Sequence, residues 1–457
     1  HHLFDGDGML HSILLPKDGD DSPAIFCSRF VRTNKYVTER DVKGGVFLNF
    51  IAGNRGLGGI QEAALFCLRA FVTGSIDISR GFGLANTSII HFADQLLALA
   101  ESDLPYAVHV SPSDGEITTI GQHDFDGYLS VNMTAHPKKD PNTGELFGYE
   151  YGPIIPFFSK FSYFWFDRNG KKQREVEISS VDRPSLMHDF AVTRNHVVFF
   201  DTEIVMRPLN ILLVRGSILE QDPNKTPRIG VLSRYAESGD EIRWFDAPGF
   251  NPSHVVNAWE EEEDGQTIVL FASNLVPFDQ FVCGLDRVRG CLEKIEIDLR
   301  DGKVTRTPMS NLNLELGVIN PRCVGRKNKY AFMGICDPIP KVSGLVKLDL
   351  GSGCVVGRRD YPPGCFGGEP FFVANCGDDG GCGPREGEED DGYVMTYLHD
   401  ENRRESSFVI MNAKSPELEI VAEVILPTRV PYGFHGTFIR EKDLEQMDRL
   451  CRDNKIQ

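Results

Sequence analysis

The chain has 457 residues, a length that fits about three ordinary domains or one large β-barrel or propeller. Hydrophobic residues make up 41% and charged residues 25% of the chain, which excludes intrinsic disorder as its general state. The formal charge is −18 and no segment is densely basic. These features argue against nucleic acid as a partner and against membrane attachment through a basic surface.

The chain begins with His1-His2-Leu3-Phe4 rather than with methionine, in a segment whose pattern predicts a strand. We therefore expect it to be the ordered part of a longer protein whose N-terminal segment is absent. No apolar run approaches the roughly 18 to 20 residues of a membrane span. The eleven cysteines are scattered without a zinc-binding spacing, which predicts reduced thiols in a reducing compartment.

A helix is predicted over residues 59–74, where apolar side chains cover most of the circumference. Two interpretations of this helix stay open. Helices of this kind are usually buried in a protein core. Alternatively, it lies in a membrane interface beside the mouth of an apolar tunnel. The side chains available to enter lipid are Leu65, Phe66, Leu68, Phe71 and Val72. A second, weaker helix is predicted over residues 206–219.

Most of the remaining chain is predicted to form short strands between turns rich in Gly, Asn and Asp. Residues 292–299 alternate between apolar and polar side chains, and Asp301-Gly302 follows as a turn. Further strands are predicted at 267–272, 345–350, 392–398, 407–411 and 420–425. Many short strands and few helices predict an all-β fold, for which a propeller is the economical architecture at this length. The acidic loop 375–391 predicts a solvated insertion rather than a calcium site.

The twelve histidines are spread along the chain and form no local metal-binding motif. In a propeller, inner strands of separate sheets converge on one axis, so distributed histidines can reach a common metal. Four of them lie in distinctive contexts. These are TAHPKKDPNTGE at His136, RPSLMHDF at His188, GFNPSHVVNAWE at His254 and PYGFHG at His435.

Three glutamates lie in apolar or glycine-rich contexts, where a buried carboxylate needs a partner. They are Glu101 in AESDLP, Glu315 in LNLELG and Glu369 in FGGEP. Their simplest interpretation is a solvated surface charge, the common fate of glutamate. Their contexts favour a second interpretation, in which each carboxylate accepts a hydrogen bond from a metal-binding histidine.

Together with the opening FDGDGMLH, these motifs resemble the carotenoid cleavage dioxygenase family of plants over essentially the whole chain. Within that family the chain is most similar to the class-four plastid enzymes. The similarity lies in GFN at residues 249–251, ESDLPY at 101–106 and AKSP at 413–416. Ser253 stands where the epoxycarotenoid-cleaving relatives usually carry a bulkier aromatic residue, and Pro252-Ser253 also departs from the usual class-four residues.

The resemblance implies a seven-bladed β-propeller with a small α-helical cap over its top face, formed by residues 1–457 as one domain. It implies Fe(2+) on the propeller axis, bound by the four motif histidines without a carboxylate ligand. The three motif glutamates are implied to orient ligand imidazoles. Ser253 and Phe434, next to two of the histidines, are candidate residues of a substrate tunnel.

The implied activity is cleavage of a C=C bond of a carotenoid or apocarotenoid by O2, giving two carbonyl products. The 9,10 (9′,10′) bond is the expected position. Cleavage at 7,8 (7′,8′), and cleavage at 11,12 of a 9-cis-epoxycarotenoid, are the alternatives. A carotenoid-binding propeller without oxygenase activity is the alternative from a different class, but it would need neither the four histidines nor the three glutamates. The implied location is the plastid, with substrate taken from a membrane or plastoglobule surface.

Overall fold

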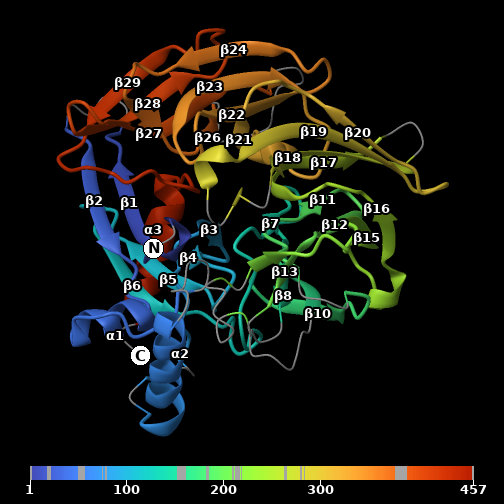
Figure 1. The fold of residues 1–457 in the computed structure, drawn as a ribbon. Helices are drawn as coiled ribbons and strands as arrows, with labels where there is room; N and C mark the ends of the chain where they lie inside the picture. Colours follow the sequence, from blue (N-terminus) through green and yellow to red (C-terminus); the bar gives the residue numbers. More distant parts are fainter. Residues whose placement is uncertain are drawn as a thin grey trace.

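The computed structural model describes residues 3–17, 22–49, 57–74, 76–77, 80–151, 161–181, 185–207, 210, 217, 219–261, 265–277, 280–281, 284–375 and 389–454. Its strands form small antiparallel sheets that follow one another in chain order around the middle of the molecule (Figure 1). Most pairs join strands that are neighbours in the sequence, so short turns suffice to connect them. The prediction of a mainly β protein is confirmed.

The first half of the chain contains a hairpin followed by three four-stranded sheets. The hairpin is β1 (Met9–Leu14) with β2 (Ile25–Phe30). The first sheet holds β3 (Ser88–Phe92), β4 (Gln95–Leu99), β5 (Tyr106–Val110) and β6 (Ile117–Gln122). The second holds β7 (Lys138–Lys139), β8 (Leu146–Tyr151), β9 (Phe161–Phe166) and β10 (Lys172–Glu177). The third holds β11 (Ala191–Val192), β12 (His196–Asp201), β15 (Arg228–Ser233) and β16 (Arg243–Asp246).

The second half contains one further four-stranded sheet and one sheet of nine strands. The smaller sheet holds β17 (Pro252–Glu260), β18 (Thr267–Val276), β19 (Arg289–Asp298) and β20 (Val304–Pro308). The larger sheet begins with β21 (Leu314–Val318), β22 (Tyr330–Cys336), β23 (Val342–Asp349) and β24 (Val355–Asp360). It continues with β25 (Cys365–Gly367), β26 (Phe371–Ala374), β27 (Gly392–Asp400), β28 (Glu405–Asn412) and β29 (Ile420–Ile425). All six strands predicted between residues 267 and 425 are confirmed, and five of them are longer than predicted.

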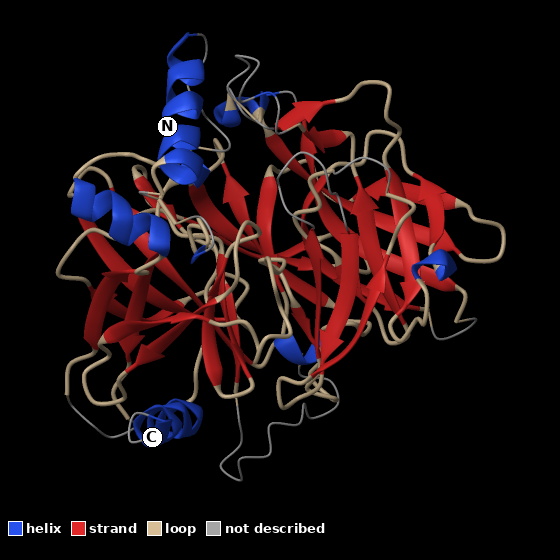
Figure 2. Cartoon of the chain, turned by 90° about the horizontal axis from the view of Figure 1, so that it is seen from below, coloured by secondary structure: helices blue, strands red, loops and turns tan. Residues whose placement is uncertain are grey.

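The described helices lie at the periphery of the strand-rich body (Figure 2). α1 (Asn34–Val42) begins after Thr33, whose hydroxyl accepts a hydrogen bond from the N–H of Tyr36. α2 (Leu57–Cys67) continues into a π-helical turn, Leu68–Val72, and confirms the helix predicted over 59–74. α2 projects from the body beside the sheet of β3–β6 (Figure 1). None of the helices in the described ranges is both long and apolar enough to cross a membrane.

One secondary-structure prediction is wrong, and a second is contradicted at both of its ends. The strand expected at the start of the chain is a 3₁₀ turn, Leu3–Asp5. The first and last residues of the helix expected over 206–219 lie in strands instead. Met206 of β13 (Ile204–Met206) pairs with Leu219 of β14 (Leu219–Gln221). Most residues between these strands lie outside the described ranges.

Apolar side chains fill the space between adjacent sheets. Phe147 and Tyr163 of one sheet pack with Phe199 and Leu232 of the next. Equivalent clusters join the following sheets in turn. A fully buried side chain of this size contributes about 1.5 to 3 kcal/mol. This packing fixes the positions of the edge strands β7, β11, β17 and β21, and β17 lies against both β11 and β21.

Candidate active site

The four motif histidines lie where these edge strands begin or where the chain returns to the centre after β29. His136 precedes β7 by two residues, His188 precedes β11 by three, and His254 lies near the start of β17. His435 follows β29 and precedes α3 (Glu441–Asn454). The ring centroid of His136 is 4.5 Å from that of His188, 5.2 Å from His254 and 4.6 Å from His435. The structure therefore brings together four side chains that are far apart in the sequence.

The ring nitrogens of three of these histidines approach one another closely. Nε2 of His188 lies 3.1 Å from Nε2 of His136 and 3.3 Å from Nε2 of His254. One ring nitrogen from each of the three lies within 4.8 Å of the others. His435 is not part of that nitrogen group, although its ring packs against His254 with centroids 4.9 Å apart.

Each of the three motif glutamates contacts a different histidine. The Nδ1 atoms of His188, His254 and His435 lie 2.5, 2.6 and 2.7 Å from carboxylate oxygens of Glu101, Glu315 and Glu369, respectively. An ionised carboxylate only accepts, so each Nδ1–H donates and each Nε2 presents its lone pair toward the centre. No carboxylate of the described residues contacts the ring of His136.

The position of Glu315 is fixed by two further donors. The hydroxyl of Ser253 donates to one carboxylate oxygen, and the N–H of Leu316 donates to the other over 2.8 Å. The pairing of β21 with β22 shifts register between Glu315 and Val318, and Leu316 has a φ of +56°. A bulge of this kind redirects a side chain out of the regular alternation, here toward the histidines.

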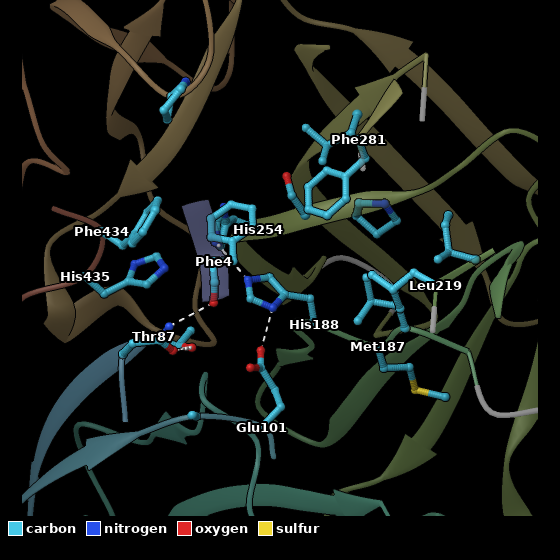
Figure 3. A pocket seen from close by; sticks show the side chains of 18 of the residues that line it. Phe4, Thr87, Glu101, Met187, His188, Leu219, His254, Phe281, Phe434 and His435 are labelled. Atoms are coloured by element: carbon cyan, nitrogen blue, oxygen red, sulfur yellow. Dashed lines mark hydrogen bonds and ion pairs between the residues drawn. The ribbon is translucent and has the colours of Figure 1, made fainter. Parts of the chain in front are cut away.

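A cavity of about 280 Å³ opens beside the histidines and is lined mostly by apolar side chains (Figure 3). His188, His254 and His435 line it, as do the predicted tunnel residues Ser253 and Phe434. Three aromatic rings form one side: Phe4 lies 5.7 Å from Phe281 and 5.2 Å from Phe434 between ring centroids. The histidine centre thus faces a space suited to an apolar ligand.

Comparison with known proteins identifies the family. The sequence model described as "Retinal pigment epithelial membrane protein" matches residues 1–440. The chloroplastic 9-cis-epoxycarotenoid dioxygenase NCED1 of Oryza sativa subsp. japonica is 50% identical over 452 residues, covering 97% of this chain and 69% of the relative. The chloroplastic probable carotenoid cleavage dioxygenase 4 of Arabidopsis thaliana is 49% identical over 454 residues, covering 98% and 74%.

The fold has a solved counterpart. The crystal structure of cobalt-substituted Synechocystis ACO, an apocarotenoid oxygenase, superimposes with a TM-score of 0.76 at 26% identity, covering 96% of this chain and 88% of that one. The chain belongs to the carotenoid oxygenase family. The predicted resemblance to carotenoid cleavage dioxygenases, which are enzymes that incorporate oxygen from O2, is therefore confirmed. The chloroplastic names of the relatives support the predicted plastid location.

The histidine geometry of this carotenoid oxygenase fits a bound metal. Separations of 3.1 and 3.3 Å between these Nε2 atoms fit lone pairs directed at one shared cation, and they equally fit a hydrogen bond between two imidazoles. Two imidazoles at right angles around a metal, each about 2.1 Å from it, would place their nitrogens about 3.0 Å apart. Neutral imidazoles are suitable ligands for iron, as they are for zinc, copper and nickel. The residues present therefore fit the iron(II) that the family implies.

The electrostatics of the site differ among the histidines: although burial opposes it, the charge and hydrogen bond of Glu101 raise the pKa of His188, whereas the pKa of His136 is lowered. Burial and the neighbouring imidazoles push the pKa of His136 well below its usual value, so its lone pair is available. Burial raises the pKa of Glu315, but the charge and hydrogen bond of His254 and the hydroxyl of Ser253 outweigh it and lower the pKa. Burial also raises the pKa of Glu101, but the charge and hydrogen bond of His188 outweigh it and lower the pKa.

The predicted lipid-contacting side chains that the structure describes, and three of the remaining histidines, lie outside the metal centre. The side chains of Leu65, Leu68 and Val72 are 43%, 46% and 75% exposed, while Phe66 packs against the ring of Phe47 with centroids 6.3 Å apart. The side chain of Phe71 lies outside the described ones. Among the histidines that were not assigned to the metal, His109, His196 and His399 bond to Asp448, Glu260 and Ser406, respectively.

Sequence reasoning missed two of the aromatic residues beside the metal centre. Phe4 and Phe281 line the cavity, but neither belongs to a histidine or glutamate motif. Asp5, which also belongs to no histidine or glutamate motif, lines the cavity as well. The available signal was the FDGDGMLH segment, which contributed to the family resemblance but gave no spatial partner for Phe4.

Proposed function

We propose that this carotenoid oxygenase binds one iron(II) through His136, His188, His254 and His435. The observation that supports this most strongly is the convergence of these four rings, three of them with a carboxylate on Nδ1, beside an apolar cavity. When bound, the iron supplies the binding and activation of O2 next to the substrate. The proposed reaction splits one C=C bond of a carotenoid or apocarotenoid into two carbonyl products.

The chain itself performs three tasks in this proposal. Glu101, Glu315 and Glu369 fix the tautomer and direction of three imidazoles, so their Nε2 atoms point inward. The apolar lining holds the polyene and excludes water. The rings of Phe4 and Phe434, which stand beside the histidines in Figure 3, restrict the position of the polyene, so one double bond lies over the centre.

We propose the 9,10 (9′,10′) double bond as the cleavage position. The relatives differ here: one is named a zeaxanthin 7,8(7′,8′)-cleavage dioxygenase from Crocus sativus at 50% identity, and one a carotenoid 9,10(9′,10′)-cleavage dioxygenase 1 from Pisum sativum at 37%. All of these names describe cleavage of a carotenoid, which supports that substrate class. Cleavage at 7,8, and at 11,12 of a 9-cis-epoxycarotenoid, are the alternatives that product analysis separates.

We also propose that the sheets form a seven-bladed propeller within one domain, residues 1–457. The hairpin β1–β2 counts as one blade and the four four-stranded sheets as four more. Dividing the nine-stranded sheet between β24 and β25 gives the remaining two. In this arrangement α1 and α2 contribute to the helical cap over one face.

The segment of α2 and the following π-helical turn is proposed to contact a lipid surface such as a plastoglobule. Carotenoids are almost insoluble in water, so the substrate must come from a lipid phase. Leu65, Leu68 and Val72 are exposed apolar side chains on a helix that projects from the body (Figure 1). Exposure of these side chains favours the interfacial interpretation over burial in a core.

Incubation of the purified protein with iron(II), O2 and β-carotene, followed by chromatography, tests the proposed reaction. The expected result is a pair of carbonyl products whose lengths identify the 9,10 bond. Cleavage at the 7,8 bond would instead give a shorter end fragment and a longer remaining fragment, which chromatography separates from the 9,10 products. A protein that binds β-carotene and iron but forms no product with any carotenoid tested would support the carotenoid-binding alternative instead.

A further inference from the structure

Asp189 follows the candidate ligand His188 and is 4% exposed. Its carboxylate accepts two backbone hydrogen bonds and forms one ion pair. One oxygen lies 2.6 Å from Nζ of Lys138 and 2.7 Å from the backbone nitrogen of the next residue, Phe190. The other oxygen lies 2.8 Å from the N–H of Val255. Within the described part of the chain, no hydrogen bond or ion pair joins this carboxylate to an imidazole ring, which distinguishes it from the three motif glutamates.

The partners of Asp189 belong to the segments that carry two other candidate ligands. Lys138 follows His136 by two residues, and Val255 follows His254 directly. One buried carboxylate therefore connects three ligand-bearing segments, which come from three different sheets. The connection runs through the backbone of β17 and through the side chain of Lys138, which is 19% exposed.

The local structure of β17 shows how Val255 reaches this carboxylate. The pairing of β17 with β18 shifts register between Pro252 and Val255, and again between Val255 and Asn257. An irregularity of this kind leaves a backbone N–H outside the regular ladder. The N–H of Val255 donates to Asp189, so the segment that carries His254 is fixed to the segment that carries His188.

A carboxylate is the side-chain group best suited to this position. Three donors face its two oxygens, and an ionised carboxylate offers acceptors only. An asparagine at this position would turn its NH2 group toward at least one of these donors. The ion pair with Lys138 is largely withdrawn from solvent, where removal of one charge leaves the other uncompensated.

We propose that Asp189 is a positioning residue that sets the spacing of His136, His188 and His254 through the backbone and through Lys138. This role gives His136 a restraint that no carboxylate supplies to its ring. The proposal rests on the proposed function, since it assumes that these histidines bind one metal. It assigns to Asp189 a role that the three motif glutamates do not fill.

Titration of the metal-free protein with cobalt(II), followed by its visible absorption spectrum, tests the proposal without turnover. Asp189→Asn and Lys138→Met should each weaken cobalt binding about tenfold, at the lower end of the range for partners of metal ligands. Both should shift the cobalt absorption bands, because the ligand arrangement relaxes. The double variant should be no weaker than the stronger single variant, since both changes break one connection.

Glu260→Gln is the matched control. Glu260 ends β17, the strand that also carries His254, and its side chain is 8% exposed. Its carboxylate bonds to Nδ1 of His196 and the N–H of Asn195, both at 2.9 Å, so it also joins neighbouring sheets. Gln at this position should lower the melting temperature but leave cobalt affinity and the spectrum unchanged.

The outcomes are distinguishable. Asp189→Asn and Lys138→Met proteins with the cobalt affinity and spectrum of the wild type would overturn the proposal. If Asp189→Asn does not fold, Lys138→Met decides alone, since it removes the ion pair and keeps most of the side-chain stem. A change in the spectrum of Glu260→Gln as large as that of the other variants would also contradict it. A wild-type protein that binds no cobalt would instead contradict the proposed metal centre itself.

Discussion

The histidine centre and the α2 segment are two regions of the molecule that depend on different physical properties. The centre is assembled from segments far apart in the chain, and three of its four imidazoles are each held by a specific carboxylate. The α2 segment is contiguous, and its exposed apolar side chains have no fixed partner in the described structure. The centre should therefore respond steeply to single polar changes, whereas α2 should respond gradually to the loss of apolar area.

The largest expected effect is the loss of a ligand. His254→Ala should abolish stoichiometric iron binding and reduce product formation more than the 10- to 100-fold typical of an outer partner. Iron content by elemental analysis and product yield measure this. His196→Ala, which removes a histidine bonded to Glu260 elsewhere, should retain its iron. Full iron content in the His254→Ala protein would show that iron binding does not depend on this histidine.

Removal of a carboxylate partner should have a smaller effect. Glu369→Gln keeps an acceptor near Nδ1 of His435 but loses its charge, so iron affinity should fall about 10- to 100-fold. Competition with a chelator measures the affinity. Glu315→Gln should behave similarly, because its single side-chain oxygen can accept either from Ser253 or from His254 and Leu316, which face different oxygens of the glutamate. Unchanged iron affinity in both variants would show that the histidine centre does not depend on single hydrogen bonds, and its contrast with the α2 segment would be lost.

In the α2 segment, each lost apolar contact should have a similar and additive effect. Leu65→Ser and Leu68→Ser should each weaken liposome binding about tenfold, since a fully buried side chain of this kind contributes about 1.5 to 3 kcal/mol. The melting temperature should change little because both side chains are largely exposed. Ile120→Ser, at an exposed position on β6, serves as the control and should not change liposome binding. A large drop in melting temperature would show that the helix belongs to the core.

The smallest expected effect concerns a carboxylate that has no role at the metal. Burial opposes its charge, but hydrogen bonds from His196, Thr193 and Asn195 lower the pKa of Glu260 to about 2. A lowered carboxylate pKa stabilises the folded state above the unfolded value, and this contribution is lost as pH falls through the folded value. The difference in melting temperature between wild type and Glu260→Gln should therefore be full at neutral pH and shrink toward pH 2. A difference that is independent of pH would contradict this.

The sequence identified the site residues better than it identified their surroundings. The four histidines and three glutamates each stand in a recognisable local motif, so they could be named from the sequence. The motifs did not state which glutamate meets which histidine, because those contacts span up to 87 residues, as between Glu101 and His188. Phe4 and Phe281 could not be found, since aromatic residues without a motif are usually core. The α1 and α3 helices were also missed, because polar helices resemble solvated loops in composition.

The aromatic side of the cavity joins residues from opposite parts of the sequence. Phe4, whose carbonyl accepts a hydrogen bond from the side-chain amide of Asn86, lies against Phe434 near the other end of the described chain. A polyene in the cavity would touch both, so release of either segment from the body would forfeit part of its binding. By linkage, ligand at 100 times its dissociation constant would add about 2.7 kcal/mol of stability. Bound substrate would therefore stabilise the contact between the first and the last segments of the described chain.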